Sequence, residues 1–168
     1  MGADGPTQAA GHSAAKTFIG GAIAFYAVFD TLTLGVATTA LVIFVFNPLT
    51  VFVAAAVGIT LLNYVCCSWV DREWGDWVTG PGKKVEAKLD RFRSSRVMRH
   101  PVDWVTRGSV VWFALAAMLI NAIVVTVAAR VVGGKPVGAR RIRVAAVAYS
   151  IFFSGVYTLL GWGASAVL

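Results

Sequence analysis

The sequence is short of charge. Asp, Glu, Lys and Arg make up 14% of its 168 residues, whereas 58% are hydrophobic and the mean hydropathy is +0.73. A soluble domain carries charge at roughly a quarter of its positions, so this composition disfavours an ordinary soluble enzyme and a disordered chain. Because the charges are clustered, uninterrupted apolar runs lie between them. We therefore predict an integral membrane protein.

Metal ligands and catalytic motifs are also scarce. The two histidines, His12 and His100, have no further ligand at helical spacing, so we predict no metal site. Cys66 and Cys67 are adjacent, a spacing that matches no redox motif, and we interpret them as small apolar side chains in a helix. Walker A, Rossmann, G-x-S-x-G and H-E-x-x-H motifs are missing from the sequence. We expect no catalytic residue and no cofactor.

The apolar runs predict an all-α bundle of four transmembrane helices. A helix of about 20 residues crosses a hydrocarbon core of roughly 30 Å. The predicted spans are residues 17–46, 49–70, 109–129 and 144–168, which form one membrane domain (17–168) after a mobile tail (1–16). Asn47-Pro48 favours a turn, so the first two spans form an antiparallel hairpin.

The first run is too long for one perpendicular span. Its 30 residues would extend about 45 Å as a helix, which leaves two arrangements open. Either it is one long tilted helix, or its first half lies near the interface and bends into a span near Asp30.

The polar loop 71–108 contains nine basic and six acidic residues. We predict one amphipathic helix over 83–99, with an apolar stripe of Val85, Leu89 and Phe92. The basic residues around this stripe are expected to contact anionic lipid headgroups: Lys83, Lys84, Lys88, Arg91, Arg93 and Arg96. Packing of this helix on the protein's own loops or on a partner is the alternative.

The count of Lys and Arg predicts the orientation. Four crossings place ten on the side of the central loop and both termini, and five on the other side. Cytoplasmic loops are the more basic ones, so we predict cytoplasmic termini in the cell (inner) membrane. The loop 130–143 is dense in charge as well, and its Arg140, Arg141 and Arg143 are further candidates for headgroup contact. If both loops are cytoplasmic, 109–129 must enter and leave on one side, although it has no Gly or Pro at which to turn.

Asp30 is the one charged residue inside the predicted spans. A carboxylate there costs about 2.5–3.5 kcal/mol on insertion scales and faces a partner or water. The hairpin geometry places Asp30 near the level of residue 65, so we predict an intramembrane polar cluster, which consists of Asp30, Asn63, Cys66, Cys67 and Arg72. Three roles remain open: a residue near the interface that pairs with Arg72 or with donors of the loop, a titrating group in a proton or cation pathway, and a catalytic carboxylate.

Small and polar residues predict helix contacts. Ala54 and Gly58 form a small-xxx-small pair that lets another helix approach closely. Asn121 lies in the middle of the third run and needs a hydrogen-bond partner in the bundle or on another protein.

Three classes of function fit these features. The first is a non-enzymatic accessory, assembly or regulatory subunit of a larger membrane complex. The second is a small homo-oligomeric transporter, channel or phage-type pore former with Asp30 in the pathway, and the third is a lipid-modifying enzyme that uses loop acids. Expected partners are anionic lipids and either another membrane protein or a second copy. The net charge of +7 is explained by headgroups and orientation, so we predict no nucleic-acid binding.

Overall fold

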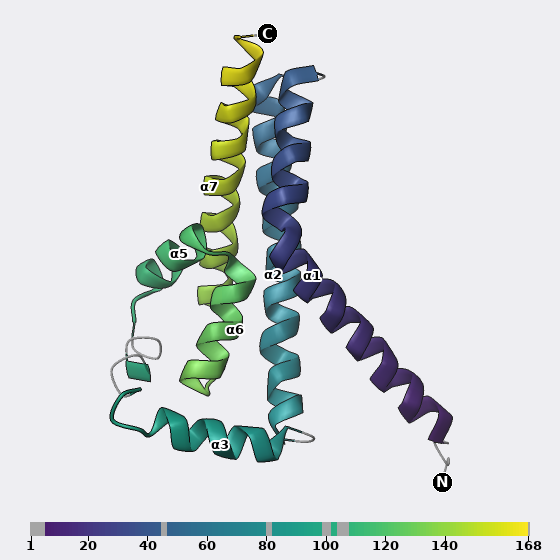
Figure 1. The fold of residues 1–168 in the computed structure, drawn as a ribbon, viewed down its shortest axis with the longest axis vertical. Helices are drawn as coiled ribbons and strands as arrows, with labels where there is room; N and C mark the ends of the chain where they lie inside the picture. Colours follow the sequence, from purple (N-terminus) through teal and green to yellow (C-terminus); the bar gives the residue numbers. More distant parts are fainter. Residues whose placement is uncertain (1–5, 45–46, 80–81, 99–101, 104–107, 168) are drawn as a thin grey trace.

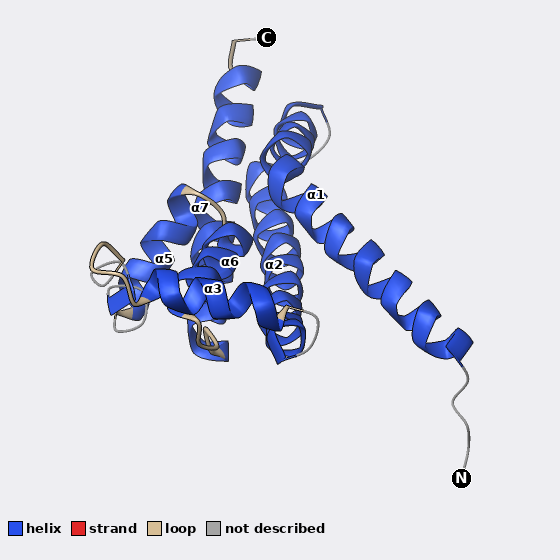
Figure 2. Cartoon of the chain, turned by 60° about the horizontal axis from the view of Figure 1, so that its bottom comes forward, coloured by secondary structure: helices blue, strands red, loops and turns tan. Residues whose placement is uncertain are grey.

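Helices make up most of the described part of the chain, and no strand occurs in it (Figure 2). The computed structural model describes residues 6–44, 47–79, 82–98, 102–103 and 108–167. Two stretches, Pro48–Asp76 and Ala139–Ser165, are each long and apolar enough to cross a membrane, and a bent helix before them is a third candidate. The predicted all-α class and membrane character are confirmed at this level. The predicted bundle of four spans is not confirmed.

Helix α1 (Pro6–Phe44) is bent by 53° between Asp30 and Leu32. The hydroxyl of Thr33 donates to the carbonyl of Phe29 at 2.7 Å, a local bond of the kind that bends helices. The bent alternative for the first run is therefore the one that the structure adopts (Figure 1).

The start of α1 lies within the predicted tail. Residues 6–16 are helical because Pro is favourable at the first helical position and the Ala-rich segment that follows has high helix propensity. Residues 1–5 lie outside the described part, and the mobility of the whole segment stays a prediction.

Helix α2 (Pro48–Thr79) runs antiparallel to the second half of α1 (Figure 1). Asn47 caps its start, because the Asn47 side-chain oxygen accepts from the Leu49 N–H at 2.8 Å and the Asn47 carbonyl accepts from the Val51 N–H at 3.1 Å. The helix continues well beyond the predicted end of the span at residue 70. The acidic side chains that follow the span therefore lie on α2 and not in a loop.

Helix α3 (Lys83–Arg93) lies across the polar end of the molecule (Figures 1 and 2). It is shorter than the predicted helix over 83–99. The hydroxyl of Ser94 donates to the carbonyl of Arg91 at 2.9 Å, and such side-chain bonds compete with the helical ladder. The chain turns from residue 94 to residue 98.

The predicted single span over 109–129 is wrong. The chain instead forms two short helices, α5 (Val110–Leu119) and α6 (Ala122–Gly133), which are separated at Ile120 and Asn121. Helices of 10 and 12 residues extend only about 15 and 18 Å, short of a core of roughly 30 Å. The chain reverses direction between them, so α6 runs back toward α3 (Figure 1).

This reversal changes the distribution of charge. The end of α6 lies at the same end of the molecule as α3 (Figure 1), and Arg93 of α3 contacts the carbonyls of Arg130 and Val131 there. Two segments that are rich in Lys and Arg therefore come together at this end. Helix α7 (Ala139–Ser165) then runs to the end of the molecule that lies away from α3 (Figure 1). The side of the membrane on which each terminus lies stays a prediction.

Small residues allow the helices to approach closely around α7, which packs against α1, α2 and α5. Ala117, Ala122, Ala145 and Ala146 are fully buried. Such residues are the usual contacts between membrane helices, because they bring backbones together.

We predict that the sidedness of the loops follows the reversal at Asn121. Lys84→Cys and Lys135→Cys will react with an impermeant thiol reagent from the same side of the membrane, and Ser165→Cys from the opposite side. The native Cys66 and Cys67 are buried and give little background. Labelling of sealed vesicles of both orientations measures this. Reaction of Lys84→Cys and Lys135→Cys from opposite sides would support four spans instead.

Gly161→Ala is expected to destabilise the fold, and Gly163→Ala is its matched control. A Cβ at Gly161 would lie 2.8 Å from the Val42 Cβ and 3.0 Å from the Thr39 carbonyl oxygen of α1, whereas nothing lies within 4 Å of one at Gly163. Overpacking costs about 1–3 kcal/mol, so only Gly161→Ala will lower the thermal unfolding midpoint in mild detergent. Equal midpoints for the two variants would contradict the contact between α1 and α7.

Candidate functional site

Asp30 lies where α1, the start of α6 and α7 come together. Its carboxylate oxygen Oδ2 accepts a hydrogen bond from the Asn121 side-chain amide at 2.8 Å and another from the Tyr149 hydroxyl at 2.5 Å. Asp30 sits at the bend of α1, Asn121 at the break before α6, and Tyr149 on α7. All three are buried, and Asp30 is only 1% exposed. We call these three residues the Asp30 node.

Asn121 has two roles in this node. Its side-chain oxygen accepts from the N–H of Ile123 at 2.7 Å and of Val124 at 3.4 Å, which caps α6. Its amide nitrogen meanwhile donates to Asp30. The free N–H groups at a helix start give it a partial positive charge, so the start of α6 also favours a negative carboxylate nearby.

The node provides a buried carboxyl group with two hydrogen-bond donors. Hydrogen bonds to charged groups contribute about 1.5–3 kcal/mol each, and together they offset the cost of holding a carboxylate in an apolar span. A catalytic carboxylate must touch its substrate, and the burial of Asp30 prevents such contact in this conformation. The arrangement joins α1, the α5–α6 pair and α7 at one depth.

The other members of the predicted polar cluster are placed differently. Asn63 is fully buried and donates to the Tyr26 hydroxyl at 3.2 Å and to the Ile59 carbonyl at 3.0 Å. Cys66 and Cys67 are buried free thiols, and Cys67 is hydrogen-bonded with Thr126 of α6.

Arg72 does not belong to the cluster. Its side chain is 72% exposed, and its Nε lies 4.0 Å from a Glu73 carboxylate oxygen. Arg72, one of the partners considered for Asp30 near the interface, does not pair with it, because α2 continues as a helix through this position and turns Arg72 outward.

Arg93 corrects a second expectation, since it was assigned to lipid headgroups. It is buried, and its Nη1 lies 2.5 Å from a Glu86 oxygen and 2.7 Å from an Asp90 oxygen. The guanidinium also donates to the carbonyls of Val131 at 2.7 Å and Arg130 at 3.2 Å, in the last turn of α6. The Arg130 carbonyl accepts a second bond, from the N–H of Gly134 at the end of this helix. Burial lowers the pKa of Arg93, but its hydrogen bonds to Glu86 and Asp90 raise that pKa by more. Arg93 therefore holds α3 against α6.

The acids at the end of α2 are used in ion pairs as well. Asp71 lies 3.1 Å from the buried Arg130 Nε and accepts from the Val137 N–H at 3.0 Å. Glu73 lies 2.7 Å from the Lys16 ammonium group. Among the described residues no group of three or more His, Cys, Asp or Glu is placed to hold a metal ion.

The remaining basic candidates for headgroup contact lie at the surface. Their exposure leaves this contact a prediction for Lys83, Lys84, Lys88, Arg91, Arg96, Arg140 and Arg143. Arg141 is partly buried and donates to the Gly108 carbonyl at 2.8 Å.

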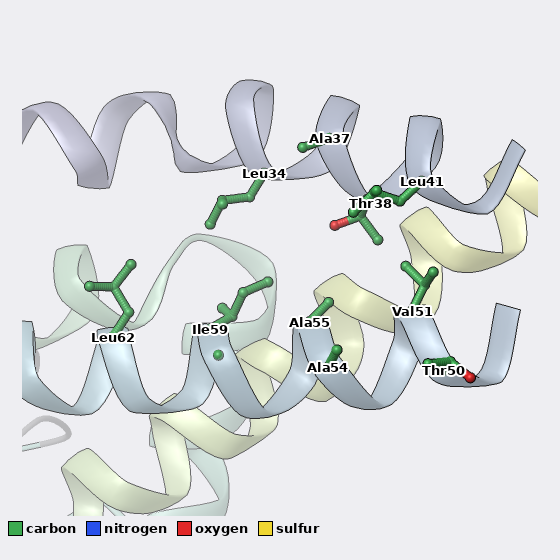
Figure 3. Close-up of a pocket in the computed structure, with 11 residues that line it drawn as sticks. Leu34, Ala37, Thr38, Leu41, Thr50, Val51, Ala54, Ala55, Ile59 and Leu62 are labelled. Carbon is green, nitrogen blue, oxygen red and sulfur yellow. The ribbon is translucent and has the colours of Figure 1, made fainter. Parts of the chain in front are cut away.

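An apolar groove of about 410 Å³ runs between α1 and α2 (Figure 3). Leu34 and Thr38 of α1 face Val51 and Ile59 of α2 across it. The predicted small pair Ala54 and Gly58 lines the groove and is exposed, and no atom lies within 4 Å of a Cβ added at Gly58. Neighbouring helices of the chain do not cover this pair. Figure 3 shows no charged side chain in the labelled lining.

Comparison of the chain with protein-family models, curated proteins and solved structures finds no match. We therefore infer a function from the geometry of the described residues.

Tyr149 and the break at Asn121 are the parts of the site that sequence reasoning missed. Asn is a favoured residue at helix starts, so Asn121 inside an apolar run was the available signal for two short helices. Nothing in the sequence pairs Tyr149 with Asp30, because the two are 119 positions apart.

Substitutions in the Asp30 node are expected to show coupled effects on stability. Tyr149→Phe will lower the free energy of unfolding by about 1.5–3 kcal/mol, because it removes a hydrogen bond to a charged acceptor. Asn121→Ala will lower the free energy of unfolding by about 1 kcal/mol more than Tyr149→Phe does, because it also removes the helix cap. Denaturant unfolding in detergent micelles measures both changes.

The control is Tyr64→Phe, since the Tyr64 hydroxyl makes no hydrogen bond to the described part of the chain. In an Asp30→Asn background the cost of Tyr149→Phe will shrink, as a double-mutant cycle requires for interacting residues. An unchanged cost in that background contradicts a direct interaction between Asp30 and Tyr149.

Proposed function

We propose that the protein is a non-enzymatic subunit of a larger membrane complex and that it holds a transmembrane helix of its partner in the groove between α1 and α2. The observation that carries this proposal is the uncovered pair Ala54 and Gly58 on the floor of the groove. Small pairs at this spacing let two helix backbones approach closely in lipid.

The chemistry of the groove defines its occupant. Aliphatic and Thr side chains make up its described lining, so a partner helix must present an uncharged face there. The groove lies in the half of the molecule where residues 31–70 and 144–168 contain no charged residue. Packing of small side chains, and not electrostatic attraction, would select the partner.

The charge distribution supports an orientation for this subunit. With α5 and α6 entering and leaving on one side, all fifteen Lys and Arg residues of the sequence belong to that side and none to the other. Basic loops stay in the cytoplasm. We therefore place the start of α1, α3 and the α5–α6 pair at the cytoplasmic face of the cell membrane, and the end of α7 outside.

Transport of protons or cations is the second candidate, and one observation favours it. Transporters bind ions where broken helices begin inside the membrane, and Asp30 lies at the start of the broken helix α6. This candidate requires a homo-oligomer without a larger partner. It predicts that Asp30→Asn abolishes flux in reconstituted vesicles.

The subunit proposal predicts that Gly58→Leu separates the protein from its partner. Leucine at this position fills the groove, whereas Val57→Leu on the exposed neighbouring position leaves it open. After gentle extraction from the native membrane, native mass spectrometry will show a larger partner with the wild type and with Val57→Leu. The amount retained by Gly58→Leu will fall at least several-fold. Wild-type protein that emerges alone or as a homo-oligomer contradicts the proposal.

A further inference from the structure

A second apolar cavity lies between α5 and α6. It is an open crevice of about 220 Å³ whose walls come from both short helices, with Trp112 and Ala116 on α5 and Ala128 and Val132 on α6. At roughly 30 Å³ for a water-sized group, this space holds a segment of an acyl chain and not a whole lipid.

Positive charge lies beside one part of this crevice, the wall at Gly108, which we call its mouth. Gly108 forms part of the crevice wall, and the guanidinium of Arg141 donates to the Gly108 carbonyl at 2.8 Å. Arg140, next to it at the start of α7, is exposed. This hydrogen bond places the guanidinium of Arg141 next to the crevice wall at Gly108.

The combination of an apolar crevice and a basic mouth matches one class of molecule. A phospholipid carries apolar acyl chains next to an anionic phosphate group. Basic pockets between membrane helices bind anionic headgroups of this kind. Because the lipid tails of the bilayer are as apolar as the crevice, moving one acyl chain into it gains little free energy. Selectivity must come from the charge at the mouth.

We propose that the α5–α6 crevice is a binding site for an anionic phospholipid, with one acyl chain between Trp112 and Ala128 and the headgroup phosphate at Arg141. This site is separate from the groove between α1 and α2 and does not depend on the partner proposed for that groove. Bound lipid would fill the space between two helices that are each too short to cross the membrane.

Trp112 provides a probe of the site because it lines the crevice. The full chain is reconstituted into phosphatidylcholine vesicles that contain a minor share of phosphatidylglycerol with brominated acyl chains. Bromine quenches indole fluorescence on contact. Subtraction of the signal of Trp112→Phe isolates the quenching of Trp112, and vesicles with brominated phosphatidylcholine at the same share give the reference.

We expect quenching of Trp112 to be several-fold stronger with phosphatidylglycerol than with phosphatidylcholine. Arg141→Gln will remove this excess, whereas Arg72→Gln, which removes the same charge from an exposed side chain, will keep it. Ala128→Phe, which occupies the crevice, will also lower the excess, and Ala24→Phe on an exposed face of α1 will not. Competition with unbrominated phosphatidylglycerol tests the wild type without any substitution.

Three results would overturn the proposal. Equal quenching by the two lipids means ordinary contact with surrounding lipid. An excess that Arg72→Gln removes as fully as Arg141→Gln means general attraction to a basic surface. An excess that survives Ala128→Phe means that a headgroup binds without a chain in the crevice.

Discussion

The carboxylate of Asp30 requires hydrogen-bond donors, and the rest of the structure is arranged so that it receives them. A negative charge in an apolar span is costly unless donors reach it. One donor comes from Asn121, at a point where the third apolar run breaks, and the other comes from Tyr149 on α7. A break within the membrane would itself leave backbone groups unpaired, but the Asn121 side chain caps α6. Asn121 and Tyr149 therefore supply the donors that the buried carboxylate needs. The cap by Asn121 also supplies an acceptor for N–H groups at the start of α6 that have no helical partner.

The break at Asn121 also decides the topology. Because neither α5 nor α6 is long enough to cross, the chain returns to the end from which it came, and the two basic loops meet there. Buried polar contacts then join these elements. The guanidinium of Arg93 on α3 donates to carbonyls in the last turn of α6, and Asp71 of α2 forms an ion pair with Arg130 of α6. The two charge-rich segments of the sequence, 71–108 and 130–143, are the ones that come together here.

Hydropathy and the capping rules predicted the helical class, the hairpin at Asn47-Pro48 and the bend near Asp30 as one of two arrangements. They failed at Asn121, because an apolar run of 21 residues has the length of a span and its composition does not show that it is folded back. The burial of Arg93 was also missed, since a helix face rich in Lys and Arg looks alike whether one of its members faces lipid or protein. The partnership of Asp30 with Tyr149 depends on tertiary packing between distant segments, which one sequence does not reveal.

The charge-free end of the molecule bears on how the protein enters the membrane. In the orientation that we propose, only the turn at Asn47 and the end of α7 reach the far side, and residues 31–70 and 144–168 contain no charged residue. Moving charge across a bilayer is the costly part of translocation, and it couples insertion to the membrane potential. In that orientation these segments carry no charged side chain across. The biogenesis of the protein is therefore expected to need little help from the potential, and newly made chains should insert even in de-energised membranes.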